Sequence, residues 1–313
     1  MSKINVFLTK HLSYLQVRGY AQGTIDNREF TINRFVTWCD MRDLEDVKLI
    51  TRPVLESYQR YLYCFRRPNG EPFSMATQAK QLISVKMFFK WLARDNYILF
   101  NPAAELELPK VRKQLPRAIL SIDEVEHLLS QPDTLAPQGV RDRAMMEMLY
   151  STGLRRTELA TVRVQDVDLK AATVFVRQGK GGYQRLVPVG VRALNWLDKY
   201  IHDVRHLFFV GVDTHVLFLT DYGEPFIKAR LSVVVKKYMK AAGIEKEGAA
   251  HLLRHAMATH MLENGADIRF IQEMLGHQKL DTTQIYTKVA IGKLKEVHRV
   301  THPSGLGELS LLL

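Results

Sequence analysis

The stretch that decides the fold covers residues 173–189 and reads TVFVRQGKGGYQRLVPV. Two runs rich in β-branched and apolar residues, 173–177 and 185–189, flank the glycine-rich segment Gly179-Lys180-Gly181-Gly182. This pattern predicts a β-hairpin with a glycine-rich tip. Most of the remaining chain has helical periodicity, so we expect a mainly α fold that contains a small β-hairpin or sheet.

The first 105 residues predict a bundle of helices. One face of the first helix carries apolar residues at helical spacing, together with His11. Further helices are expected at about 24–39, after Thr51, which is a plausible N-cap, and from Ser74 onward. Asn69-Gly70 and Asn101-Pro102 mark loops. Four helices joined by short loops predict a small helical domain.

A second domain is expected after residues 106–117, which hold four basic residues, one acidic residue and two prolines. This composition predicts a basic linker. Ser121 and Glu124 form the pattern of a capping box at the start of the next helix. Further helices are expected near 141–150 and 191, and at 228–242, 249–264, 267–275 and 281–286. We therefore predict a helical domain at 1–105, a linker at 106–117, a mixed α and β domain at 118–298 and a tail at 299–313.

The bulk composition indicates an intracellular protein with a polyanionic partner. The 313 residues carry a formal net charge of +11 and include 46% hydrophobic residues. A basic chain with this much core-forming material is typical of proteins that bind nucleic acid. Cys39 and Cys64 are too few for a disulfide framework, which favours the reducing cytoplasm. Apolar runs such as residues 207–210 are too short to span a membrane, so no membrane association is expected.

Four separate stretches carry residues suited to attack on a phosphodiester. They are 152–159 (TGLRRTEL), 179–181 (GKG), 251–255 (HLLRH) and 275–277 (LGH), followed by Tyr286. Each is weak alone: Arg155 could simply pair with Glu158, and Lys180 could be solvated. His251 and His255, at i and i+4, could indicate a metal site, although a third ligand and the His-Glu-x-x-His pattern are missing.

Taken together, the stretches predict metal-free chemistry on DNA or RNA. Two arginines can bind both non-bridging oxygens of one phosphate, and a histidine can move a proton near neutral pH. A lysine on a hairpin can reach a leaving oxygen, and a tyrosine can supply the nucleophile. No cofactor and no metal ion are required by this set.

The set resembles that of the tyrosine recombinase (phage integrase) family, which uses Arg, Lys, His-x-x-Arg, His or Trp, and Tyr in this order. The matching residues are Arg155, Lys180, His251, Arg254, His277 and Tyr286. Residues 284–290 and the later His298 and His302-Pro303 resemble the Xer group within that family. The resemblance implies an N-terminal SAM-like core-binding domain that binds DNA, followed by a mixed α+β catalytic domain.

The resemblance also implies a site-specific DNA recombinase. Tyr286 would form a 3′-phosphotyrosyl bond while Arg155, Arg254 and His277 stabilise the phosphate. His251 would move the tyrosine proton, and Lys180 would protonate the leaving 5′ oxygen. Implied partners are double-stranded DNA recombination sites, further recombinase subunits in a homo- or hetero-tetramer on DNA, and an accessory DNA-binding protein. The biological role would be integration or excision of a mobile element, or resolution of DNA multimers.

Three alternatives remain open at this stage. A topoisomerase IB-like nicking-closing enzyme would use similar chemistry without a synaptic partner. A non-catalytic DNA-binding regulator could be built on the same fold. A basic metalloprotein would use His251 and His255 as ligands, and metal analysis would test it.

Overall fold

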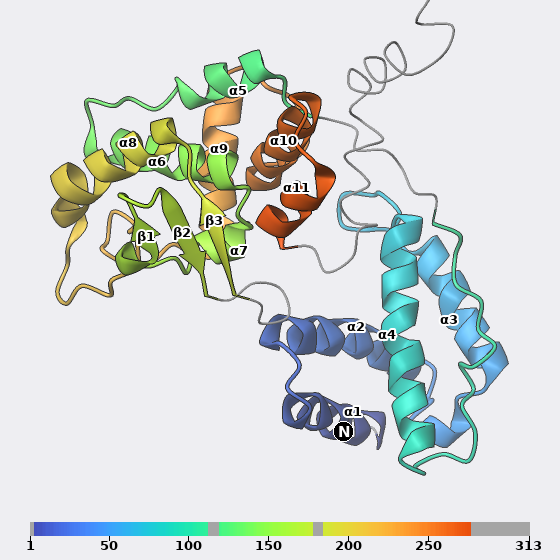
Figure 1. Ribbon diagram of the computed structural model, residues 1–313. Helices are drawn as coiled ribbons and strands as arrows, with labels where there is room; N and C mark the ends of the chain where they lie inside the picture. The colour runs from blue at the N-terminus through green and yellow to red at the C-terminus, as the bar shows by residue number, and fades with distance from the viewer. Residues whose placement is uncertain (1–2, 112–118, 178–183, 277–313) are drawn as a thin grey trace, which may run out of the picture. The chain divides into compact units, whose positions relative to one another are not determined.

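The structure is a computed structural model that describes residues 3–111, 119–177 and 184–276 (Figure 1). The chain divides into two compact units, Met1–Lys113 and Gln114–Leu313. The fold is mainly helical with one small sheet, as the sequence predicts. Among the described residues, no helix is long and apolar enough to cross a membrane.

The first unit is built from the four predicted helices, which are α1 (Lys3–Val17), α2 (Gln22–Asp40), α3 (Arg52–Cys64) and α4 (Met75–Arg94), with a short 3-10 turn η1 (Val47–Leu49). The side chain of Ser74 caps α4 by accepting a hydrogen bond from the backbone N–H of Thr77 at 3.2 Å. Thr51 precedes α3 as predicted, but its side chain makes no capping hydrogen bond.

Aromatic side chains fill the core of this unit. Phe35, Trp38 and Tyr58 are fully or almost fully buried, and so are Phe88 and Phe89 of α4. The ring centroids of Phe35 and Tyr58 lie 4.9 Å apart in an edge-to-face arrangement, which aromatic pairs favour. The apolar face predicted for the first helix is confirmed, since its spacing places the following residues in the interior: Ile4, Leu8, His11 and Leu15.

The sheet of the second unit has three antiparallel strands in the order β1-β2-β3, which are Val167–Asp168, Thr173–Val176 and Arg185–Pro188. Strands β2 and β3 are the predicted hairpin, with Val174 opposite Val187. Both of these valines are buried. The sequence reasoning missed β1 because a two-residue strand is too short to show an alternating pattern.

In the second unit the helices lie above and to one side of this sheet in the view of Figure 1. They are α5 (Ile122–Leu129), α6 (Pro137–Thr152), α7 (Arg156–Leu159), α8 (Val191–Lys199), α9 (Lys228–Ala241), α10 (Ala250–Glu263) and α11 (Ile268–Leu275). Short turns complete the unit: η2 (Val164–Asp166), the π-helical η3 (Tyr200–Val204) and η4 (Arg205–Phe208). The predicted capping box at α5 is present: the Ser121 hydroxyl accepts the backbone N–H of Glu124 at 3.1 Å, and the Glu124 carboxylate accepts the backbone N–H of Ser121 at 2.7 Å. The helix predicted at 281–286 lies outside the described residues.

Candidate active site

A glycine directs the chain from α6 into the first predicted site residue. Gly153 ends α6 in the left-handed conformation, with φ of 61°. This positive φ is the reason for a glycine here, and a Cβ atom would in addition displace the side-chain ends of Met257 and Leu275, at 2.1 and 2.9 Å. The chain then reaches Arg155, which is the N-cap of α7.

A buried carboxylate orients Arg155. Glu158 is only 2% exposed, and its Oε1 lies 2.8 Å from Nη1 of Arg155. Its Oε2 accepts the backbone N–H of Arg155, also at 2.8 Å. Burial opposes ionisation of Glu158, but hydrogen bonds from Arg185 and Arg155 outweigh it and hold its pKa below the usual value. The local ion pair considered from sequence is therefore present, and it fixes the direction of the guanidinium.

The second predicted arginine meets the first at the end of α11. Arg254 lies on α10 and is 7% exposed. Its guanidinium donates to the carbonyl of Gly153 and, at 2.8 Å, to the carbonyl of Leu275. Nη2 of Arg155 donates to the next carbonyl, that of Gly276, at 3.2 Å. Two arginines that are 99 positions apart in sequence thus converge on consecutive peptide units.

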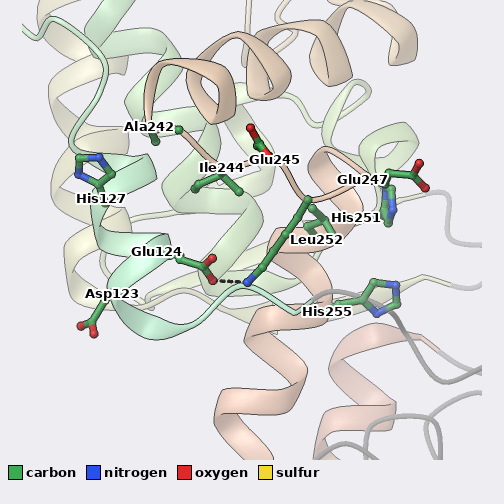
Figure 2. Close-up of a pocket in the computed structure, with 12 residues that line it drawn as sticks. Asp123, Glu124, His127, Ala242, Ile244, Glu245, Glu247, His251, Leu252 and His255 are labelled. Carbon is green, nitrogen blue, oxygen red and sulfur yellow. Dashed lines mark hydrogen bonds and ion pairs between the residues drawn. The ribbon is translucent and has the colours of Figure 1, made fainter.

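His251 lies on the first turn of α10, three residues before Arg254, at the edge of a pocket of about 940 Å³. Figure 2 shows His251 and His255 on one side of this pocket, with Asp123 and His127 of α5 on the other. Lys246, which also lines this pocket, pairs with Glu124 of α5.

The pKa values of His251 and His255 are both lowered, which favours their neutral form. Burial, together with the positive charge of Arg156, lowers the pKa of His251. Burial, His251 and Arg254 lower the pKa of His255 to about 4. A neutral imidazole can accept a proton, as a general base must.

The histidine pair lacks the surroundings of a metal centre in the described part of the chain. The ring centroids of His251 and His255 are 5.9 Å apart and the rings are perpendicular. Among the described residues there is no group of three His, Cys, Asp or Glu residues that could hold a metal ion. The metalloprotein hypothesis therefore gains no support from this pocket.

Three of the six predicted site residues lie outside the described residues: Lys180, His277 and Tyr286. Their roles stay predictions. The described residues nearest to them in sequence are Arg177 and Gln184, which flank the segment that contains Lys180, and Gly276, which directly precedes His277.

Sequence reasoning missed Arg185, although it contacts this site. Its guanidinium donates to both carboxylate oxygens of Glu158, at 3.1 and 2.8 Å, and to the carbonyl of Met274 at 2.8 Å. A signal was available, because alternate residues of a strand share a face and Arg185 is two positions from the buried Val187. An inward-facing arginine requires a buried acceptor.

Both units of the chain match models of one protein family. Residues 118–292 match the model of the phage integrase family. Residues 7–99 match the SAM-like N-terminal domain of phage integrases.

Curated relatives match over nearly the whole chain. Tyrosine recombinase XerC 2 of Ralstonia nicotianae is 51% identical over 300 residues, covering 96% of this chain and 86% of the relative. Tyrosine recombinase XerD of Listeria monocytogenes is 37% identical over 304 residues, covering 96% and 99%. Among solved structures, the XerH site-specific recombinase bound to palindromic difH substrate, in a post-cleavage complex, has a TM-score of 0.72 at 23% identity. It covers 94% of this chain and 83% of its own, and it supports the fold alone.

The chain therefore belongs to the phage integrase family of tyrosine recombinases. Within that family it is a Xer-like tyrosine site-specific recombinase, as the resemblance in its motifs predicts.

Proposed function

We propose that this chain cleaves and rejoins double-stranded DNA at specific recombination sites through a 3′-phosphotyrosyl bond at Tyr286, without ATP or a metal ion. One observation carries the proposal: Arg155 and Arg254 are oriented by consecutive carbonyls at the end of α11. Two adjacent planar cations suit the two non-bridging oxygens of a phosphodiester.

In the proposed reaction, the phenolic oxygen of Tyr286 attacks the scissile phosphorus and the bond to the 5′ oxygen breaks. Because a free tyrosine has a pKa of about 10, its proton must be removed, and the neutral His251 is suited to accept it. Lys180 donates a proton to the departing 5′ oxygen. The ester conserves the energy of the broken bond, so a 5′-hydroxyl of a second strand can reverse the attack and release the tyrosine.

The guanidiniums and His277 replace a metal ion in this reaction. Charge accumulates on the equatorial oxygens of the phosphorane-like transition state, and preorganised donors stabilise it without reorganisation. Glu158 holds Arg155 in place before DNA binds, so the enzyme need not order that side chain during the reaction.

The two units divide the work in this proposal. Residues 1–105 bind DNA as the core-binding domain, 106–117 form a basic linker, 118–298 carry catalysis and 299–313 form a tail. The working assembly is a homo- or hetero-tetramer on two recombination sites in the cytoplasm, with or without an accessory DNA-binding protein. Formation of that synaptic complex distinguishes a recombinase from a nicking-closing enzyme.

A covalent trap tests the chemistry. The protein is mixed with fragmented host DNA and denatured in detergent, and the DNA that stays attached is sequenced, with Tyr286→Phe as the control. We expect enrichment of one short site that disappears in the control. The genomic position of the site then separates multimer resolution from mobile-element integration or excision. An adduct that persists in Tyr286→Phe would refute the assignment, and stable DNA binding without any adduct would favour a regulator.

Lys180 has its own test. Lys180→Ala should slow cleavage, and a DNA substrate with sulfur at the bridging 5′ position should restore the rate, because a thiolate leaves without protonation. Absence of rescue would remove Lys180 from the role of acid.

A further inference from the structure

The last turn of α11 is held by three arginines from three different elements. The carbonyl groups of residues 274, 275 and 276 each accept a hydrogen bond from a different guanidinium. In order, the donors are Arg185 at 2.8 Å, Arg254 at 2.8 Å and Arg155 at 3.2 Å. Carbonyls at a helix C-terminus lack partners within the helix and carry the negative end of its dipole, so cations stabilise them.

All three guanidinium nitrogens of Arg185 point at the protein. Nε donates to Met274, while Nη1 and Nη2 donate to the two carboxylate oxygens of Glu158. The side chain is only 10% exposed. It therefore cannot present the same donors to a phosphate.

Gly276 packs directly against this guanidinium. It caps α11 with φ of 60°, and a Cβ atom there would lie 3.0 Å from Nη1 of Arg185 and 3.1 Å from its Cζ. The backbone turn that leads to His277 is thus formed against the Arg185 side chain. Figure 1 shows α7, β3 and α11 close to one another, and Arg185 of β3 contacts both Glu158 of α7 and Met274 of α11.

We propose that Arg185 is a positioning residue for the reaction, an inference that rests on the proposed function. It bridges Glu158 to the end of α11, and through this bridge it sets where the chain leaves Gly276 for His277. The same carboxylate orients Arg155, so Arg185 aligns one phosphate-binding arginine with the segment that carries the predicted histidine. A forked guanidinium is required, because one ammonium group cannot hold both acceptors in this geometry.

The hairpin supplies a matched control. Arg177 directly follows β2 and donates to the buried Asp166 at 2.6 Å, and among the described residues none of its hydrogen bonds or ion pairs reaches α11. Arg177→Met removes an arginine–carboxylate pair from the same hairpin. Arg185→Met removes the bridge. Arg185→Lys keeps the charge beside Glu158 without the fork, and it serves as the second variant if Arg185→Met folds poorly.

The assay measures single-turnover formation of the phosphotyrosyl adduct at saturating DNA, together with the DNA dissociation constant. We expect Arg185→Met and Arg185→Lys to lower this rate between about tenfold and about 100-fold, since misplacement by about 1 Å has costs of that order. The dissociation constant should stay within about twofold, because phosphate contacts made elsewhere dominate DNA affinity. Arg177→Met should keep the wild-type rate. A wild-type rate in Arg185→Met, or full rescue by Arg185→Lys, would overturn the proposal.

A double-variant comparison identifies the residue through which Arg185 acts. In a His277→Ala background, Arg185→Met should slow adduct formation little further, because the positioned group is already absent. In a Lys180→Ala background, the two losses should multiply. Multiplying losses in the His277→Ala background would show that Arg185 does not act through His277.

Hydrogen exchange tests the bridge without relying on activity. Arg185→Met should accelerate exchange in a peptide covering residues 268–276, whereas Arg177→Met should leave it unchanged. Unchanged protection in Arg185→Met would overturn the inference even if the enzyme is active. If exchange is faster in Arg185→Met but the wild-type protein forms no Tyr286-dependent adduct, the proposed function would be refuted. The structural role of the Arg185 bridge would still stand.

Discussion

Acid should destabilise the first unit through a single buried histidine. His11 of α1 is 3% exposed, and its ring lies 4.9 Å from that of Trp91 and 5.4 Å from that of Phe88. Neither ring nitrogen has a hydrogen-bond partner among the described residues. Burial, aided by the positive charges of Arg28 and Arg94 and opposed by Asp95, lowers the pKa of His11 from 6.5 to about 4.

The magnitude follows from proton linkage. In the unfolded chain His11 binds a proton below about pH 6.5, whereas in the folded chain it stays neutral down to about pH 4. Between these values the unfolded state holds more protons, so the free energy of unfolding decreases as pH falls. The slope is about 1.4 kcal/mol per pH unit, and the full loss is on the order of 3 kcal/mol by pH 4. Above pH 6.5 this contribution to stability is complete.

Urea unfolding between pH 7.5 and pH 4, values chosen to bracket the titration, measures this loss. A Trp196→Phe background leaves tryptophan only at positions 38 and 91, so that fluorescence reports the first unit. His11→Phe should remove the slope, and His215→Phe, at a side chain that is 69% exposed, should retain it. Equal pH dependence in His11→Phe and the wild-type protein would refute the reasoning.

Three further predictions concern the active site. Glu158→Gln should destabilise the second unit by about 3–5 kcal/mol in urea unfolding, because two guanidiniums lose their buried partner; a loss below about 1 kcal/mol would contradict this. Gly153→Ala should lower the rate of adduct formation and cost more than about 1 kcal/mol of stability, because its φ is positive and alanine is strained there; a neutral effect in both assays would be contrary to the structure. The pKa of His251, followed by NMR in the DNA-free protein, should lie below 6.5 and rise in Arg156→Met, where a repelling charge is gone; a fall in that variant would reverse the expected sign.

Elements set by neighbouring residues could be predicted from sequence alone. The capping box at Ser121 and Glu124 depends on residues three positions apart, and the hairpin depends on alternating valines around a glycine-rich turn. The Arg155–Glu158 pair was also visible as an i, i+3 possibility. Strand β1 could not be predicted, because two residues are too few to show an alternating pattern. It is recognised as a strand only by its pairing with β2.

Contacts between distant segments could not be predicted in this way. Arg185 is 27 positions from Glu158 and 89 from Met274, and nothing in the local sequence names either partner. Arg254 reaches back 101 positions to the carbonyl of Gly153. These pairings arise because α6, α10 and α11 pack around buried apolar residues, which brings helix ends together irrespective of chain distance.

The sequence by itself determined the chemistry available to this protein: the types and order of its site residues, its positive charge, and the helical and hairpin patterns that surround them. These features depend on residue identity and short spacing. Only the tertiary structure decided that Arg155, Arg185 and Arg254 all donate to carbonyls at the end of α11. It also decided that His251 lines a pocket and that its pKa is lowered. The physical reason is that orientation, burial and charge compensation depend on which surfaces pack together, and packing is a property of the whole folded chain.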